Sequence, residues 1–203
     1  MKCKKVIGLT GSIATGKSTA ANILRKLGYE VIDSDKLGHL LMEPGQANYL
    51  GIVEEFGQEI LLDDSSINRP MLSQIVFSDK SKLEKLNKIT HHNIFTQING
   101  IIQKSENIII FVELPILVEL KLEDKLSIDF DEIWLVYVSQ KMQMKRLMER
   151  NNFTSDQALD RIKSQLSVEV KKAHADFIIF NDKDISHMEK QIKDRLKVYE
   201  SRT

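Results

Sequence analysis

Hydrophobic residues gather in five short segments in which nearly every position is apolar, separated by longer stretches that mix polar and apolar residues. Strands that are covered on both faces are apolar throughout, whereas half-exposed strands alternate. The segments therefore predict buried strands at 6–9, 31–32, 108–112, 133–138 and 177–180.

A helix is predicted between the first two strands. Residues 17–27 carry apolar side chains at helical spacing, namely Ala20, Ile23, Leu24 and Leu27. Gly28 follows as the stop of this helix. A strand, a helix and a second strand within so short a span predict a right-handed βαβ unit, and hence an α/β fold with a parallel sheet.

Two stretches interrupt this alternation. Residues 36–103 are predicted to be mostly helical and are too many for one crossover, so we expect a helical subdomain inserted in the sheet. Residues 141–170 are highly charged and predict a helical hairpin over the sheet's edge, with a capping box at Thr154 and Gln157. The remaining segments would form the core: 1–35, 104–140 and 171–203.

The composition is that of a folded domain, and it argues against several classes of protein. Of the 203 residues, 42% are hydrophobic, enough for a real core, and 29 basic side chains balance 29 acidic ones. A net charge of zero gives no general reason to expect a nucleic-acid partner. The longest apolar run, 108–112, is too short to cross a membrane, and the single Cys3 cannot form an internal disulfide. We therefore expect a soluble cytoplasmic protein without a nucleic-acid, membrane or obligate protein partner.

Directly after the first predicted strand, residues 11–18 match the pattern G-x-x-x-x-G-K-[ST]. The spacing lets backbone N–H groups curl around one phosphate, and the helix that starts near Lys17 adds positive potential. Lys17 would reach the β- and γ-phosphates of a nucleoside triphosphate, and Ser18 would place its hydroxyl on Mg²⁺. The predicted nucleotide-binding residues of this phosphate loop are Gly11, Ser12, Ile13, Ala14, Thr15, Gly16, Lys17, Ser18 and Thr19.

The phosphate loop alone does not separate kinases from GTPases. A guanine-specific loop N-K-x-D is absent from the sequence, because 87–90 lacks the aspartate and 181–184 has the wrong order. The sequence therefore lacks the motif that usually confers specificity for guanine nucleotides.

The second predicted strand ends in Asp33-Ser34-Asp35. Ligands of open α/β sheets bind at the carboxyl ends of the strands. A carboxylate at this place could accept a proton from an acceptor hydroxyl or hold Mg²⁺ through water. An acidic turn or an N-cap of the next helix is the alternative, and both interpretations stay open at this point.

A series of motifs follows along nearly the whole chain: 8–11, the phosphate loop, 31–35, 43–45, 75–79, 86–91, 114–119 and 175–181. Many kinases share the phosphate loop, but the aspartate pair followed by Glu43-Pro44-Gly45 is much more selective. Together these motifs resemble the dephospho-coenzyme A kinase family.

This resemblance implies a phosphate-loop NTPase fold with a five-stranded parallel sheet, a helical CoA-binding insertion at 36–103 and a helical lid at 141–170. It implies that the γ-phosphoryl group of ATP is transferred, with Mg²⁺, to the 3′-hydroxyl of the ribose of dephospho-CoA. Asp35 matches the family's proposed general base, and Asp33 would support the acceptor site or the metal. The resemblance also adds Arg69 and His91 as substrate-binding residues and Asn181 as a nucleotide-binding residue.

The sequence departs from the family pattern at two places that bear on the chemistry. Ala14 stands where the loop usually has a glycine, although alanine adopts a positive φ less readily. Glu113 stands where an aspartate is common after the third strand, so a carboxylate is retained with one more methylene.

The charged hairpin supplies candidate cations for the γ-phosphate, on which phosphoryl transfer concentrates negative charge. Arg146 and Arg150 are four residues apart and share one helical face, and Arg161 lies on the next helix. A solvated charged face is the usual alternative. By resemblance to the lid arginines of the family, we assign Arg146 to the nucleotide, Arg150 to catalysis and Arg161 to the substrate.

We therefore predict an ATP- and Mg²⁺-dependent kinase of this family. A kinase of nucleoside monophosphate type stays open as an alternative, although the long helical insert after Asp35 favours CoA. A phosphate-loop regulatory protein that hydrolyses nucleotide slowly is the second alternative, and the lack of a guanine motif argues against it.

Overall fold

The computed structural model describes residues 4–200, and of Glu200 only the backbone. Cys3 lies outside the described residues. The described chain forms two compact units: the first comprises the residues up to Ile32 and those from Glu106 onward, and the second is Asp33–Ser105.

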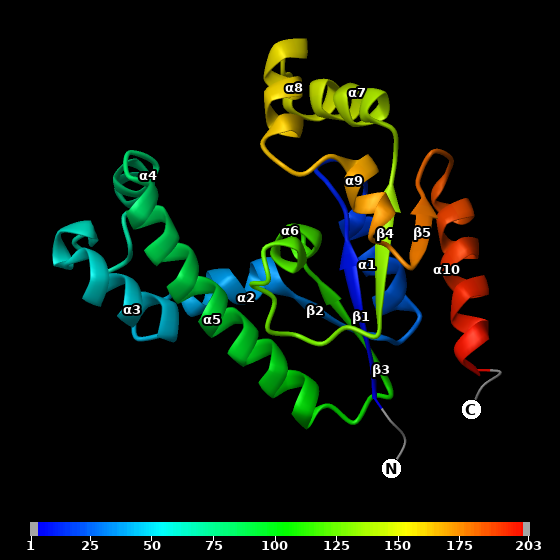
Figure 1. The fold of residues 1–203 in the computed structure, drawn as a ribbon, viewed down its shortest axis with the longest axis horizontal. Helices are drawn as coiled ribbons and strands as arrows, with labels where there is room; N and C mark the ends of the chain where they lie inside the picture. The colour runs from blue at the N-terminus through cyan, green and yellow to red at the C-terminus, as the bar shows by residue number, and fades with distance from the viewer. Residues whose placement is uncertain (1–3, 201–203) are drawn as a thin grey trace. The chain divides into compact units, whose positions relative to one another are not determined.

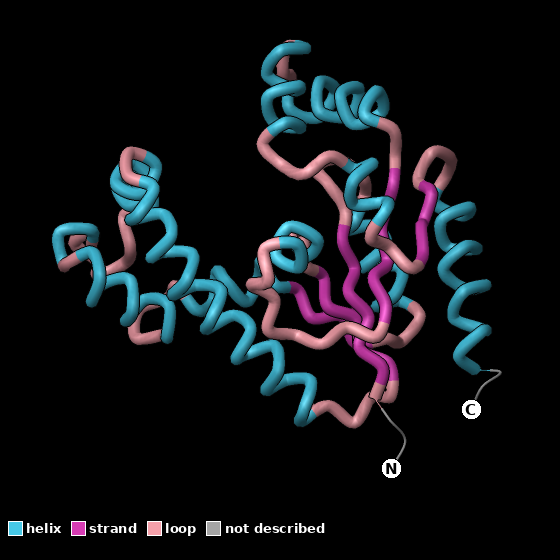
Figure 2. The backbone as a smooth tube through the Cα atoms, in the orientation of Figure 1, coloured by secondary structure: helices cyan, strands magenta, loops and turns pink. Residues whose placement is uncertain are grey.

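The first unit is built on a five-stranded sheet in the order β2-β3-β1-β4-β5. The parallel strands, magenta in Figure 2, are β1 (Lys5–Thr10), β2 (Glu30–Asp33), β3 (Ile109–Glu113), β4 (Glu132–Tyr137) and β5 (Phe177–Phe180). All five predicted strands are confirmed. The chain leaves β1 toward β2 on one side and leaves β4 toward β5 on the other. The strand order therefore reverses between β1 and β4, which is where open α/β sheets bind ligands.

Helices of the first unit connect these strands (Figure 1). They are α1 (Lys17–Lys26), α6 (Leu117–Leu122), α7 (Gln140–Asn151), α8 (Ser155–Lys163), α9 (Val168–Ala173) and α10 (Ile185–Glu200). The predicted first helix and its glycine stop are confirmed, since Gly28 has a φ of 89° and donates its N–H to the carbonyl of Arg25 at 3.0 Å. The capping box is confirmed too, with the Thr154 side chain accepting from Gln157 N–H and Gln157 reaching back to Thr154.

Two layers of helix enclose the sheet. On one face, α1 and α10 cover a hydrophobic cluster that includes Leu9, Phe111 and Trp134, all fully buried. On the other face α6 approaches β1 so closely that a Cβ atom on Gly8 would lie 2.3 Å from Leu117 Cδ1. Burial on both faces explains why the strand segments are apolar without alternation.

The edge strand β5 is closed by a side chain of α10. Gln191 Nε2 donates to the carbonyl of Phe180 at 2.8 Å, and Gln191 Oε1 accepts the N–H of Phe180 at 3.0 Å. The glutamine amide thus occupies both backbone groups as a neighbouring strand would.

The second unit is helical apart from a short antiparallel bridge between Leu61 and Ile67. Its helices are α2 (Ser34–Leu41), α3 (Ala47–Phe56), the 3₁₀ turn η1 (Gln58–Ile60), α4 (Arg69–Phe77) and α5 (Lys80–Lys104). It has a hydrophobic cluster of its own, formed by Ile52, Phe56, Ile60, Ile67, Leu72 and Val76. Among the described residues, no helix is both long and apolar enough to span a membrane.

Glu132, the first residue of β4, ties the carboxyl-terminal helix to the sheet. Its carboxylate accepts from Lys5 Nζ at 3.0 Å, from Arg195 Nη2 at 2.8 Å and from the Tyr199 hydroxyl. Trp134 Nε1 adds a further donor at 3.1 Å. Burial alone would raise the pKa of Glu132, but the hydrogen bonds outweigh it and hold this pKa at about 2.

Replacing this carboxylate should cost stability in a pH-dependent way. Glu132→Gln is expected to lower the free energy of unfolding by about 1.5–3 kcal/mol at pH 7, because several hydrogen bonds to a charge become bonds to a neutral amide. The folded-state pKa is depressed, so the contribution of the charge is full above about pH 4.5 and fades as the pH falls toward 2. Urea unfolding of both proteins at pH 7 and pH 3 measures the difference.

The control is Glu84→Gln, which changes an exposed carboxylate on α5. It should leave the unfolding free energy within about 0.5 kcal/mol of the parent at both pH values. A deficit of Glu132→Gln that is as large at pH 3 as at pH 7 would contradict the assigned role.

Candidate active site

The phosphate loop connects β1 to α1 through two residues in the left-handed region, Ala14 with a φ of 61° and Gly16 with a φ of 96°. Inside the loop, the N–H and Oγ1 of the fully buried Thr15 both donate to the carbonyl of Ser12, at 3.3 Å and 2.9 Å. The loop therefore adopts the tight curl that its spacing predicts, and Ala14 takes the backbone conformation that favours glycine.

Several backbone N–H groups of the loop and the following helix stay available for a ligand. Within the described part of the chain, no hydrogen bond uses the N–H of Ala14, Gly16, Lys17 or Ser18. These groups lie at the amino-terminal end of α1, where the helix dipole adds positive potential. Such a concentration of donors suits a phosphate group.

Lys17, the first residue of α1, pairs with Glu113 at the carboxyl end of β3. Lys17 Nζ lies 2.6 Å from Glu113 Oε1, and Arg25 Nη2 lies 3.5 Å from Oε2. The side chains of Lys17 and Glu113 are 13% and 5% exposed. Because β3 pairs with β1 in a register that sets Leu9 opposite Glu113, this carboxylate is held beside the phosphate loop.

The residues at this place fit a magnesium ion that a nucleotide brings with it. Mg²⁺ in phosphoryl-transfer sites is coordinated mainly by phosphate oxygens and water, with one or two protein oxygens. Ser18, the second residue of α1, has an exposed side chain next to the free N–H groups. No group of three or more His, Cys, Asp or Glu residues suited to a metal occurs among the described residues. The Ser18 hydroxyl suits a metal that the phosphates also hold.

Side chains from α7 and from the segment after β5 bind the outward-facing carbonyls of the loop. Gln143 Nε2 donates to Ile13 O at 2.7 Å, and Arg146 Nη1 lies 3.2 Å from Ala14 O and 3.4 Å from Thr15 O. Asn181 adds Nδ2 to Thr15 O at 2.8 Å, and its own carbonyl accepts Arg146 Nη2 at 2.7 Å. Arg146 and Asn181, predicted from the sequence, are thus joined to the loop.

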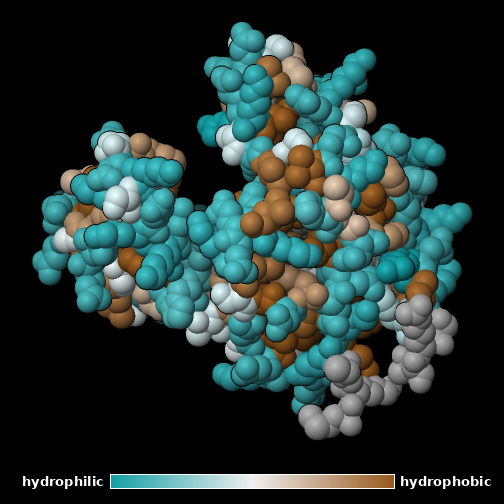
Figure 3. Space-filling model, in the orientation of Figure 1, coloured by the Kyte–Doolittle hydropathy of each residue, from teal (hydrophilic) through white to brown (hydrophobic). Residues whose placement is uncertain are grey.

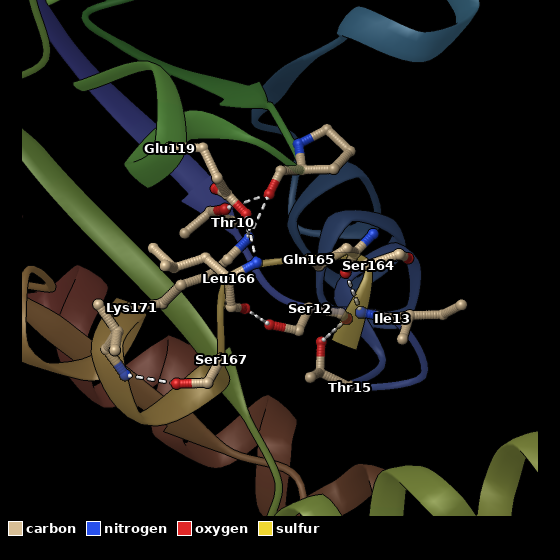
Figure 4. A network of polar contacts seen from close by, with 12 residues as sticks. Thr10, Ser12, Ile13, Thr15, Glu119, Ser164, Gln165, Leu166, Ser167 and Lys171 are labelled. Atoms are coloured by element: carbon tan, nitrogen blue, oxygen red, sulfur yellow. Dashed lines mark hydrogen bonds and ion pairs between the residues drawn. The ribbon is translucent and has the colours of Figure 1, made fainter. Parts of the chain in front are cut away.

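The segment that follows α8 binds the other side of the loop (Figure 4). Gln165 Oε1 accepts the N–H of Ile13 at 2.8 Å, and Ser12 Oγ donates to Leu166 O at 3.3 Å. The Leu166 N–H in turn donates to Glu119 Oε1 at 3.3 Å. The loop is therefore continuous, through hydrogen bonds, with residues on α6.

Behind this segment lies a buried ion pair. Lys171 is fully buried, and its ammonium lies 2.8 Å both from Glu119 Oε1 and from Pro115 O, which also accepts Thr10 Oγ1 at 3.1 Å. Burial lowers the pKa of Lys171, and Glu119 opposes that shift. Figure 4 shows Glu119 and Thr10 near the Leu166 segment. The pair thus links α6, α9 and the end of β1.

A cavity of about 560 Å³ opens beside the loop. Its lining comes from the loop, α1, α7, the segment after β5 and the start of α10: Ala14, Gly16, Thr19, Arg146, Glu149, Arg150, Asn181, Lys183, Asp184 and Ile185. The structure thus brings Arg146 and Arg150 to the same cavity as the loop. This size suits a small organic ligand.

The hairpin of α7 and α8 presents its charged face to solvent, with hydrophobic residues visible among hydrophilic ones in Figure 3. Arg150 is exposed, and its Nε donates to Asn151 Oδ1 at 3.0 Å. Arg161 on α8 is exposed as well, and no hydrogen bond or ion pair of its side chain is found within residues 4–200. The structure therefore does not join Arg161 to the cavity beside the loop.

In the second unit, Asp33 caps α2 by accepting the N–H of Lys36 at 3.0 Å, so the N-cap alternative holds for this residue. Asp35 is exposed in the first turn of the same helix. Arg69 Nη1 lies 2.7 Å from His39 Nδ1, which joins α4 to α2. His91 on α5 stacks on Phe95, with ring centroids 5.9 Å apart.

Sequence reasoning missed four polar residues around the loop: Gln143, Gln165, Glu119 and Lys171. Gln143 carries a local signal, because it precedes Arg146 by three residues and shares its helical face, and Glu119 ends the motif at 114–119. The others depend on contacts between distant segments.

The strand order and the loop at the end of β1 define the class of phosphate-loop NTPase folds. A solved shikimate kinase from Acinetobacter baumannii has the same fold, with a TM-score of 0.54 at 11% identity, covering 100% of this chain and 96% of that one.

Within this class, the sequence model of the dephospho-CoA kinase family matches residues 5–187. The chain therefore belongs to the dephospho-CoA kinase family, whose activity is the ATP-dependent phosphorylation of dephospho-CoA. It is 41% identical over 190 residues to the dephospho-CoA kinase of Carboxydothermus hydrogenoformans, covering 92% of this chain and 90% of that protein. It is 39% identical over 192 residues to that of Listeria innocua, covering 93% and 94%. The solved dephospho-CoA kinase from Campylobacter jejuni gives a TM-score of 0.68 at 27% identity, covering 98% and 100%.

Gly16 offers a test of the loop geometry, with Gly28 as its matched control. Both residues have a positive φ, which costs an L-residue about 1–2 kcal/mol. A Cβ on Gly16 would also lie 2.1 Å from Asn181 Nδ2, whereas a Cβ on Gly28 meets no described atom within 4 Å. Gly16→Ala should therefore lose more unfolding free energy than Gly28→Ala and should alone weaken ADP binding.

Urea unfolding and titration calorimetry with ADP measure these two effects. Equal stability losses together with an unchanged ADP affinity in Gly16→Ala would contradict the close approach of Asn181 to the loop.

Proposed function

We propose that this enzyme transfers the γ-phosphoryl group of ATP to the 3′-hydroxyl of the ribose of dephospho-CoA, giving coenzyme A and ADP. The observation that carries the proposal is the set of available backbone N–H groups beside Lys17, at the start of α1, in a chain of the dephospho-CoA kinase family. Phosphoryl transfer depends on positioning and electrostatic stabilisation more than on covalent chemistry, and this set supplies both.

The nucleotide binds through residues 11–19. The N–H groups of the loop hold the β-phosphate, and the Lys17 ammonium neutralises charge on the β- and γ-phosphates. The Ser18 hydroxyl would hold Mg²⁺, and the Glu113 carboxylate lies close enough to Lys17 to orient its ammonium. Mg²⁺, when bound, would offset the negative charge of the phosphates. Arg146 and Asn181 border the rest of the nucleotide site.

The acceptor hydroxyl is activated by Asp35. As the bond between the γ-phosphorus and the 3′-oxygen forms, the bond from this phosphorus to the β,γ-bridging oxygen breaks, and Asp35 accepts the hydroxyl proton. Arg150 stabilises the charge on the transferred group. Arg69, His91 and Arg161 bind the acceptor, and Asp33 supports the acceptor site or the metal.

Incubation of the purified protein with ATP, Mg²⁺ and dephospho-CoA tests the function directly. The product should gain the mass of one phosphoryl group, and nuclease treatment or NMR should place that group on the 3′-oxygen. Lys17→Ala is the matched inactive variant, because it removes the ammonium that neutralises the transferred phosphate. A panel with nucleoside monophosphates in place of dephospho-CoA excludes the other kinase alternative. Product formation from a nucleoside monophosphate alone would overturn the proposal.

Asp35→Asn separates the general base from the other residues. Asparagine keeps the size of the side chain but does not accept the hydroxyl proton, so kcat should fall by roughly 10²–10⁴-fold, toward the lower end if the transition state is loose. The Kd for ATP should stay within about twofold, since the phosphate loop is unchanged. Steady-state kinetics and calorimetry measure both values.

Asp33→Asn is the companion variant. Asparagine is as good an N-cap as aspartate, so α2 keeps its cap and only the charge is removed. If Asp33 supports the metal, this variant should need more Mg²⁺ for half-maximal rate while retaining most of its kcat at saturating Mg²⁺. Full activity of Asp35→Asn together with an inactive Asp33→Asn would reverse the two roles.

A further inference from the structure

The phosphate loop has a geometric requirement that its own residues do not meet. In a trans peptide the C=O and the following N–H point in opposite directions. N–H groups that face a phosphate therefore leave the preceding carbonyls facing away from it, and a buried carbonyl needs a donor. The carbonyls of Ile13 and Thr15, which precede the available N–H groups of Ala14 and Gly16, are of this kind, and their donors come from Gln143, Arg146 and Asn181.

Gln143 differs from the other two donors. It is 1% exposed, it borders neither the cavity nor solvent, and its amide reaches Ile13 O at 2.7 Å. Gln165 holds the N–H of the same residue at 2.8 Å. Both backbone polar groups of Ile13 are thus bound by glutamine side chains, one from α7 and one from the segment just after α8.

The hydrogen bond from Gln143 orients the Ile13–Ala14 peptide plane, and Gln165 holds the preceding plane through the Ile13 N–H. Because Gln143 holds Ile13 O on the outer side of the loop, the N–H of Ala14 points to the inner side. That N–H is one of the groups with no hydrogen bond in the described chain. Ala14 also occupies the left-handed region, which is unfavourable for an L-residue, so this conformation needs support from outside the loop.

Apolar contacts support the same attachment. The side chains of Ile13 and Ala14 pack against the hydrophobic cluster of the hairpin, which includes Leu147, Ala158 and Ile162. The hairpin and the outer side of the loop therefore form one packed body. Its buried hydrogen bond from Gln143 can break only by leaving two polar groups without partners, which is costly.

We infer that Gln143 is a positioning residue for nucleotide binding: its hydrogen bond to Ile13 O directs the Ala14 N–H toward the β-phosphate. This inference rests on the proposed function only in taking ATP as the nucleotide, and it needs no acceptor. Gln143 touches neither the phosphate nor the acceptor, so its effect is transmitted through the Ile13–Ala14 peptide.

Gln143→Met tests the inference, because methionine has a similar length and no donor. Losing an oriented hydrogen bond to a charged phosphate should raise the Kd for ADP about tenfold, while the Kd for AMP, which has no β-phosphate, stays within about twofold. Titration calorimetry gives the ADP value and competition against ADP gives the AMP value. The control is Gln140→Met, at an exposed position of the same helix, and it should change neither value.

A second variant keeps the test decisive if Gln143→Met does not fold. In Gln143→Glu the buried carboxyl donates to Ile13 O only when it is protonated. Its ADP affinity relative to the parent protein should therefore recover as the pH is lowered from 8.5 to 6, whereas the relative AMP affinity should not change.

Equal weakening of ADP and AMP, or an ADP affinity that neither substitution changes, would overturn the inference. Because these measurements use ADP and AMP alone, their result is independent of whether coenzyme A is formed. A failed coenzyme A assay with a tenfold loss of ADP affinity in Gln143→Met would reject the proposed acceptor and keep the role of Gln143.

Discussion

A loop that turns its N–H groups toward one ligand must turn its carbonyls elsewhere, and the rest of the first unit is arranged around that constraint. The carbonyls of residues 13–15 are bound by side chains from α7 and from the end of β5. The supporting elements must therefore hold their positions closely, and the parallel sheet does this by fixing where β1, β4 and β5 end. Catalytic sites need such rigid support for their binding groups.

Features encoded by neighbouring residues were predictable from the sequence. The five strands follow from continuous apolar segments, and the phosphate loop and the Thr154 capping box follow from fixed local spacings. The sequence left two interpretations of Asp33-Ser34-Asp35 open, because an aspartate after a strand can either cap the next helix or take part in a catalytic site. In the structure, Asp33 is the N-cap of α2, because its Oδ1 accepts the N–H of Lys36.

Features that depend on distant segments were not predictable. Gln165 meets Ile13 across 152 positions, and Lys171 meets Pro115 across 56. A glutamine or lysine in a charged helical region is usually solvated, so its residue type carries no signal of burial. Lys171 can be buried because its ammonium binds the Pro115 carbonyl just before α6 and the Glu119 carboxylate on α6. Only the folded chain brings these groups together.

Gln191 has a consequence for how molecules of this enzyme meet one another. An uncovered sheet edge offers backbone groups to which a second chain can add a strand. In the short β5, alternate residues present these groups outward, so Phe180 is one of only two such places, and the α10 amide already occupies it. Templated strand addition at this edge is thereby restricted by a single side chain, without any charge or proline in the strand.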